Sequence, residues 1–209
     1  MVRTVKQNYF FNRNFKKLNL DITHRCPLEC HLCGRQRSFR YKGLTVPGRD
    51  LSLTDFDKIS NFFPKISFCG QYSDPIHHPQ FIDILQICKE KNIDTEIHVA
   101  SSHKKIEWFI KAFQVCPDAE WIFGIDGLPE ESHRYRKNQD GVKLFEIMKE
   151  SKNYLIKTPV WQYILFRYNQ NDLQSALKIA NDNGFQFFLI DSARFDEGDP
   201  FKPTIRGIK

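Results

Sequence analysis

The stretch Asp21-Ile-Thr-His-Arg-Cys-Pro-Leu-Glu-Cys-His-Leu-Cys-Gly-Arg35 holds three of the six cysteines of this 209-residue chain. They are Cys26, Cys30 and Cys33, with the spacing C-x3-C-x2-C. Three thiolates on one short loop can bind three corners of an iron–sulfur cube. The fourth iron then has no protein ligand nearby and is open to a substrate or cofactor. We therefore expect these cysteines to be metal ligands.

Outward from this stretch, short apolar runs alternate with amphipathic helical patterns. The runs predict six strands, at 18–22, 66–69, 95–100, 121–125, 160–166 and 185–190. Between them, apolar residues recur with helical spacing, as at Phe81, Ile84, Leu85 and Cys88. Such alternation indicates a parallel sheet with right-handed crossovers.

A closed barrel of eight such units typically needs ~250 residues, and this chain has room for about six. The predicted fold is therefore α/β, a partial, open (β/α)6 barrel. We expect a single domain over 1–209, with an N-terminal extension at 1–17 and a C-terminal tail or lid at 195–209.

Composition points to a globular protein, with 41% hydrophobic and 14% aromatic residues. No apolar run is long enough to span a membrane, and the N-terminus lacks the apolar core of a signal peptide. The tight cysteine triplet favours metal over disulfides, so we expect a reducing compartment, by default the cytoplasm. The net charge of +6 indicates either a solvated basic surface or an anionic substrate. Small basic clusters at 35–42 and 134–137 are candidates to flank a site.

Polar residues follow every predicted strand, where ligands gather in parallel α/β folds. They are Gly70 to Pro75, Ser101 and Ser102, Asp126 and Gly127, Arg167 and Asn169, and Asp191, Ser192 and Arg194. Their coincidence at one edge of the sheet predicts a binding site there.

The cysteine spacing, directly after the predicted first strand, resembles the signature of the radical S-adenosylmethionine (radical SAM) superfamily. The run Phe68-Cys-Gly-Gln-Tyr-Ser-Asp-Pro-Ile-His-His-Pro79 resembles that family's Gly-Gly-Glu-Pro loop, with Asp74-Pro75 at the Glu-Pro position. Phe123-Gly-Ile-Asp-Gly-Leu128 resembles a Ser-Ile-Asp-Gly stretch of the branch that includes peptide-modifying members. The similarity spans roughly 18–194. It implies a minimal core domain without the extension that binds auxiliary clusters.

The resemblance implies two cofactors, a 4Fe–4S cluster and S-adenosylmethionine chelated to its open iron. Reductive cleavage would then give a 5′-deoxyadenosyl radical, which abstracts hydrogen from a small molecule (nucleotide or sugar) or a peptide. An external one-electron reductant, flavodoxin-like or ferredoxin-like, is implied as a partner. The residues expected to bind S-adenosylmethionine are Gly70, Gln71, Ser73, Asp74, Pro75, Ser101, Asp126, Arg136 and Asn169.

Within that set, the resemblance implies that Asp74 lies near the methionine amino group and that Arg136 pairs with the methionine carboxylate. Arg134 takes the latter role if the register is shifted. Asp126 either binds ribose hydroxyls or caps a turn with Gly127. Ser101 either donates to the cofactor or caps the next helix. An Asn at the place of Asn169 can contact the adenosine.

Other interpretations stay open. A non-catalytic electron carrier or redox sensor would need a fourth cysteine close in space. A zinc-stabilised binding module could use His24 or His31 as the fourth ligand. Cys69, Cys88 and Cys116 are expected to be buried thiols. Small-molecule and peptide substrates are not ranked, and a nucleic-acid substrate is possible but unsupported.

Overall fold

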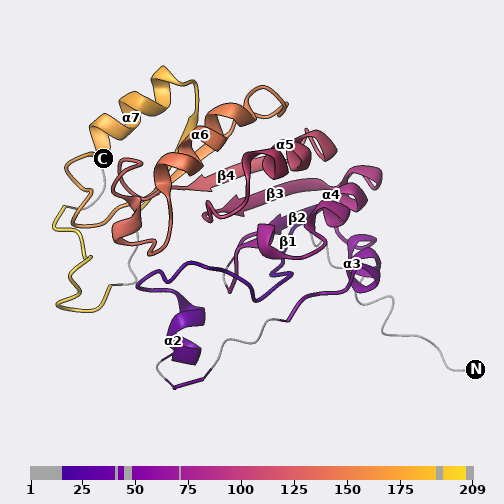
Figure 1. Ribbon diagram of the computed structural model, residues 1–209, viewed down its shortest axis with the longest axis horizontal. Coiled ribbons are helices and arrows are strands. Elements are labelled where there is room, and N and C mark those ends of the chain that lie inside the picture. Colours follow the sequence, from indigo (N-terminus) through magenta and orange to yellow (C-terminus); the bar gives the residue numbers. More distant parts are fainter. Residues whose placement is uncertain (1–15, 41, 45–48, 71, 192–194, 206–209) are drawn as a thin grey trace, which may run out of the picture.

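A computed structural model describes residues 16–40, 42–44, 49–70, 72–191 and 195–205. Its centre is a six-stranded sheet in which every neighbouring pair is parallel. The strands are β1 (Leu18–Asn19), β2 (Lys65–Phe68), β3 (Asp94–Val99), β4 (Glu120–Gly124), β5 (Val160–Ile164) and β6 (Gln186–Ile190). Their order in the sheet is their order in the chain, so β1 and β6 are its two edges (Figure 1). The predicted α/β fold with an open six-stranded sheet is confirmed.

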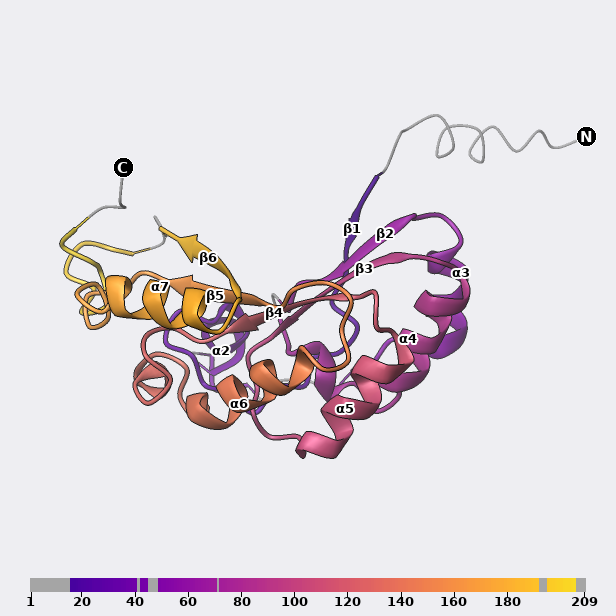
Figure 2. The ribbon, with the colours of Figure 1, turned by 90° about the horizontal axis from the view of Figure 1, so that it is seen from above.

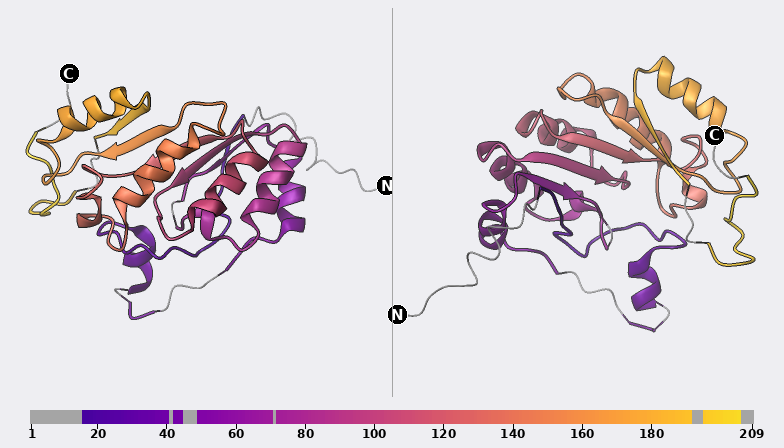
Figure 3. Two further views of the ribbon diagram at one scale, coloured as in Figure 1. Left: turned by 45° about the horizontal axis from the view of Figure 1, so that its top comes forward. Right: turned by 180° about the vertical axis from the view of Figure 1, so that it is seen from behind.

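Helices follow the strands because their apolar stripes need a surface to cover. The helices are α2 (Gly34–Arg40), α3 (Leu53–Ser60), α4 (Phe81–Glu90), α5 (Ile106–Val115), α6 (Gly141–Ser151) and α7 (Leu173–Asp182). The four from α3 to α6 lie side by side along one face of the sheet (Figure 2). In contrast, α2 lies apart from that layer, together with the cysteine loop (Figure 3). The site therefore faces away from the helical layer.

Aromatic side chains fill the space between the sheet and these helices. Trp121 and Trp161 are fully buried. The ring of Phe113 on α5 meets Trp121 edge-on at 4.8 Å between centroids. The indole of Trp161 donates to the Ile125 carbonyl at 2.8 Å. This core supports the carboxyl ends of β4 and β5, on which much of the site is built.

Two predicted strands run at least two residues too far at their carboxyl ends. The first ends at Asn19 rather than 22, because residues 22–24 turn to bind residues 49–51, with backbone hydrogen bonds from Leu51 to Ile22 and from His24 to Arg49. The fifth ends at Ile164 rather than 166. There the Phe166 N–H donates to the side chain of Asn169 at 2.8 Å instead of to a neighbouring strand.

The sequence patterns also missed α2, because its residues Gly-Arg-Gln-Arg-Ser-Phe-Arg carry no apolar stripe. Most of the predicted N-terminal extension lies outside the described residues, as do Ser192 and Arg194. Among the described helices, none is long and apolar enough to cross a membrane.

Candidate functional site

The three cysteines lie on the loop after β1, at the carboxyl end of the parallel strands. All three are free thiols with partly exposed side chains. Leu28 and Leu32 between them are buried and anchor the loop to the core. The loop also closes on itself, since the Cys33 N–H donates to the Cys30 carbonyl at 3.1 Å.

Arg35, at the start of α2, fastens this loop. Its buried guanidinium donates to the carbonyls of Cys26 at 2.8 Å and Leu28 at 2.9 Å. The Gln36 amide adds a donor to the Leu28 carbonyl at 3.3 Å. Because guanidinium donors form a rigid fork, these bonds set the direction of the loop backbone. In the sequence, Arg35 appeared only as part of a basic cluster.

Two of the thiols are buried enough to resist ionisation. Burial raises the pKa of Cys26 to about 12, and the nearby Asp74 carboxylate adds to the effect. Burial raises the pKa of Cys30 to about 11, although the positive charge of Arg136 opposes the shift. A bound metal replaces the thiol proton and stabilises the thiolate. In chemistry and placement, the cysteines therefore suit metal ligation.

Among the described residues, no three His, Cys, Asp or Glu side chains surround a point that one metal ion could occupy.

Asp126 and Arg136 form a buried ion pair beside Cys30. Arg136 Nε lies 2.7 Å from Asp126 Oδ2, and the Asp126 side chain is fully buried. Its other oxygen accepts the Ile164 N–H at 2.8 Å, which ties the end of β4 to β5. Burial raises the pKa of Asp126, while the charge of Arg136 opposes that shift. Asp126 and Arg136, both expected to bind S-adenosylmethionine, thus lie together and pair with each other.

Gly124, at the end of β4, makes room for this pair. A Cβ built on Gly124 would lie 2.8 Å from the Nη2 atom of Arg136. The guanidinium therefore rests against the strand backbone.

Asp74 is a structural anchor in this state of the chain. Its Oδ2 accepts the N–H groups of Ala100 at 2.8 Å and Ser101 at 2.6 Å, and its Oδ1 accepts the Ile76 N–H at 3.3 Å. Burial raises the pKa of Asp74 to about 6, although these three donors oppose the shift. The carboxylate holds the loop after β2 against the end of β3.

Ser101 is fully buried between two histidines. Its Oγ lies 2.8 Å from His77 Nε2 and 3.1 Å from His103 Nδ1. The idea that Ser101 caps the next helix is wrong, because α5 begins after Lys105 and has no side-chain cap. Burial lowers the pKa of His77 to about 4, which keeps its ring neutral at pH 7.

The other residues expected to bind S-adenosylmethionine lie in the segments that follow β2 and β5. Gly70 has φ +59°, a conformation that favours glycine, and Pro75 opens the short helix Pro75–His77. The Ser73 hydroxyl donates to Asp21 at 3.2 Å. The buried Asn169 amide donates to the Ile164 carbonyl at 3.0 Å. Gln71 lies outside the described residues.

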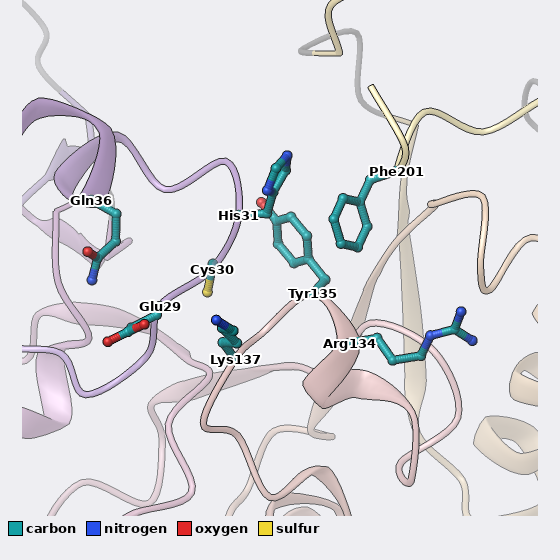
Figure 4. A pocket seen from close by; sticks show the side chains of 8 residues that line it. All are labelled: Glu29, Cys30, His31, Gln36, Arg134, Tyr135, Lys137 and Phe201. Atoms are coloured by element: carbon teal, nitrogen blue, oxygen red, sulfur yellow. The ribbon is translucent and has the colours of Figure 1, made fainter. Parts of the chain in front are cut away.

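A pocket of about 540 Å³ opens beside Cys30 (Figure 4). The cysteine loop, α2, the segment after β4 and the C-terminal tail each contribute to it. Its lining residues are Glu29, Cys30, His31, Gln36, Arg134, Tyr135, Lys137 and Phe201. The sequence had already indicated two of these residues, Arg134 and Lys137, through the basic cluster at 134–137. Nothing in the sequence pointed to Phe201.

The tail reaches the pocket through specific contacts. Asp196 lies 3.5 Å from Arg37 and Asp199 lies 3.7 Å from His31. The Phe201 carbonyl accepts the Arg167 N–H at 2.9 Å. The described part of the predicted tail or lid is therefore attached to both the cysteine loop and the turn after β5.

No protein-family model matches the sequence, and neither does any curated protein. Solved structures do match in shape. Streptococcus suis SuiB bound to the precursor peptide SuiA superposes with a TM-score of 0.70 at 14% identity, over 88% of this chain and 41% of SuiB.

Two further structures agree. Methylornithine synthase (PylB) gives a TM-score of 0.60 at 16% identity, over 97% of this chain and 60% of its own. The protein anSMEcpe with bound AdoMet and a peptide gives 0.60 at 15% identity, over 88% and 54%. All three are radical SAM enzymes. This chain has the radical SAM fold. It spans about half the length of those proteins, and at these identities the likeness concerns the fold.

The place of Gly124 in the radical SAM fold gives a first prediction. Gly124→Ala should push Arg136 from its seat, weaken the pair with Asp126, and lower the free energy of unfolding by about 1–3 kcal/mol. Chemical denaturation measures this. Gly34→Ala is the matched control, since no atom lies within 4 Å of its added Cβ. Equal stability of both variants would show that Arg136 is not held against β4.

A second prediction concerns Asp74. Its pKa of about 6 in the folded chain exceeds the ordinary 3.8. The protonated form therefore contributes stability that is complete below about pH 4 and is lost as pH rises through about 6. Relative to Asp74→Asn, the wild-type free energy of unfolding should fall by up to about 3 kcal/mol over that range.

Denaturation of both proteins at about pH 4.5 and about pH 7.5 tests this. Asp182, which forms an exposed ion pair with Lys178, supplies the control. The difference in unfolding free energy between the wild type and Asp182→Asn should be the same at both pH values. A wild-type-to-variant difference that is the same at both pH values would contradict a buried proton on Asp74.

Proposed function

We propose that this chain is a radical SAM enzyme that cleaves S-adenosylmethionine reductively. One observation carries the proposal: the C-x3-C-x2-C loop lies at the carboxyl ends of the strands in a radical SAM fold, beside Asp74, Asp126 and Arg136. Neither the sequence spacing nor the fold alone brings these groups together.

Cys26, Cys30 and Cys33 would hold a 4Fe–4S cluster, with Arg35 fixing the loop that carries them. When bound, the reduced cluster supplies the electron that splits S-adenosylmethionine into methionine and a 5′-deoxyadenosyl radical, which takes hydrogen from the substrate. The Cys26 and Cys30 thiols, with their raised pKa values, stay protonated until metal binds. Loading should therefore release protons.

The remaining site residues would bind and orient S-adenosylmethionine. Arg136 offers donors beyond the Nε atom that faces Asp126, and a guanidinium suits the planar methionine carboxylate. Asp74 would act mainly by holding the loop after β2, so that its backbone acceptors face the methionine ammonium. We assign Gly70, Gln71, Ser73, Pro75, Ser101 and Asn169 to the same cofactor site.

The substrate in this proposal is a small molecule or a peptide. SuiB and anSMEcpe have been solved with peptides, and PylB is a methylornithine synthase. An external one-electron reductant of flavodoxin or ferredoxin type would supply the electron, in a reducing compartment such as the cytoplasm. The second candidate function, an electron carrier or redox sensor, shares the cluster but forms no 5′-deoxyadenosine.

The deciding experiment is anaerobic. The full chain is reconstituted with iron and sulfide, mixed with S-adenosylmethionine and dithionite, and assayed for 5′-deoxyadenosine by mass spectrometry. Cys30→Ala should abolish the product. Cys116→Ala, at a buried cysteine after α5 and away from the loop, should retain it.

The outcomes separate the candidates. Zinc without iron or sulfide after anaerobic purification would end the cluster hypothesis. An intact iron–sulfur spectrum with neither product nor S-adenosylmethionine binding would favour the electron carrier.

Arg136 gives a further prediction. Arg136→Lys keeps a positive charge near Asp126 but loses the fork, so S-adenosylmethionine affinity should fall about tenfold. Isothermal titration of the reconstituted chain measures this, with the exposed Arg49→Lys as control. If Arg134→Lys lowers the affinity for S-adenosylmethionine and Arg136→Lys does not, then Arg134 binds the methionine carboxylate.

A further inference from the structure

The pocket beside Cys30 is separate from the residues assigned to S-adenosylmethionine. Of the residues assigned to the cluster and to S-adenosylmethionine that the structure describes, Cys30 lines it, as does Arg134, the alternative partner of the methionine carboxylate. Asp74, Ser101, Asp126 and Asn169 are buried at the strand ends instead. The pocket therefore adjoins the proposed cluster on a side that the proposed cofactor residues leave free.

Aromatic rings form part of the pocket wall. Tyr135 stacks on Phe166 with 4.1 Å between ring centroids, and Phe201 meets Tyr135 edge-on at 5.6 Å. The His31 ring lies 4.8 Å from that of Phe201. These contacts hold the rings in place within the chain itself, so the rings present a preformed surface on which a planar group can pack.

The backbone also sets the position of Phe201. Besides the bond from Arg167, its own N–H donates to Asp199 at 2.8 Å, and Asp199 lies close to His31. The tail thus brings a distant aromatic residue to the cysteine loop as a fixed part of the wall.

The pocket carries more positive than negative charge. Its described lining residues include two cations, Arg134 and Lys137, and one carboxylate, Glu29. Arg134 is already engaged, by Glu131 at 3.1 Å and by the ring of Tyr168 at 4.7 Å.

Lys137 differs from Arg134, because its ammonium forms no ion pair with any residue that the structure describes. Its backbone is held, since the Lys137 carbonyl accepts the Glu29 N–H at 3.2 Å. Its side chain points toward the space beside Cys30 (Figure 4). An ammonium without a partner at a pocket wall suits a carboxylate, phosphate or sulfonate.

We propose that this pocket binds the substrate, and that the substrate is a small organic anion with a planar ring. Lys137 pairs with the anionic group, while Tyr135, Phe201 and His31 contact the ring. The identification of this ligand as the substrate rests on the proposed function. The preference of the pocket for a planar anion follows from its lining residues alone.

Two fluorescent probes that differ in one charged group test the pocket. Anilinonaphthalene sulfonate carries a planar ring system and an anion, and N-phenylnaphthylamine is its uncharged counterpart. Both are titrated into the reconstituted full chain. We expect the sulfonate to bind about threefold more tightly than the uncharged probe, as one added ion pair with an exposed lysine predicts.

Variants assign that difference to residues. Lys137→Met should weaken sulfonate binding about threefold and leave binding of the uncharged probe unchanged, and Lys137→Arg should restore sulfonate binding. Phe201→Ala should weaken both probes. Lys178→Met, at an exposed lysine on α7, and Phe62→Ala, at an exposed aromatic, should affect neither.

Three results would overturn the proposal: no binding of the sulfonate to the wild type, unchanged sulfonate affinity in Lys137→Met, or displacement of the sulfonate by S-adenosylmethionine. The last would assign the pocket to the cofactor. These readouts do not involve 5′-deoxyadenosine. A chain with Lys137-dependent probe binding but no 5′-deoxyadenosine would keep the pocket and lose the radical SAM assignment.

Discussion

The buried ion pair of Asp126 and Arg136 is the constraint on which the rest of the site depends. Removing one partner would leave an uncompensated charge in a medium of low dielectric constant, which typically costs about 3–5 kcal/mol. The pair holds three parts of the chain together: the end of β4 through Gly124, the end of β5 through Ile164, and the neighbourhood of Cys30. The absence of a Cβ at Gly124 gives the Arg136 guanidinium its present place against the strand.

Other buried polar side chains form hydrogen bonds with backbone groups at the strand ends, where the pairing of parallel strands stops. Arg35 satisfies carbonyls of the cysteine loop, and Asp74 satisfies N–H groups after β3. Asn169 closes the end of β5, while the Gln139 amide donates to the Gly124 carbonyl at 2.9 Å. Each supports a loop that carries candidate chemistry. The same residues can therefore be essential to the site without touching a ligand.

The proposed cofactor set and the pocket divide the space around Cys30 by polarity. On one side, the charged groups of Asp126 and Arg136 are paired with each other at the carboxyl ends of the strands. On the other, the pocket has aromatic walls and the ammonium of Lys137, which forms no ion pair with the residues that the structure describes. This arrangement depends on the tail, which brings Phe201 across to the cysteine loop.

Sequence patterns predicted the strand–helix alternation, the cysteine triplet and the residues at the strand ends, because these depend on local periodicity and on adjacency along the chain. They did not reveal α2, whose residues lack an apolar stripe. Three further features required the folded chain: the pairing of Asp126 with Arg136, the bonds of Asp74 to backbone groups, and the place of Phe201 in a pocket beside Cys30. Those outcomes depend on which loops meet in space, and a buried charge takes the partner that folding brings to it.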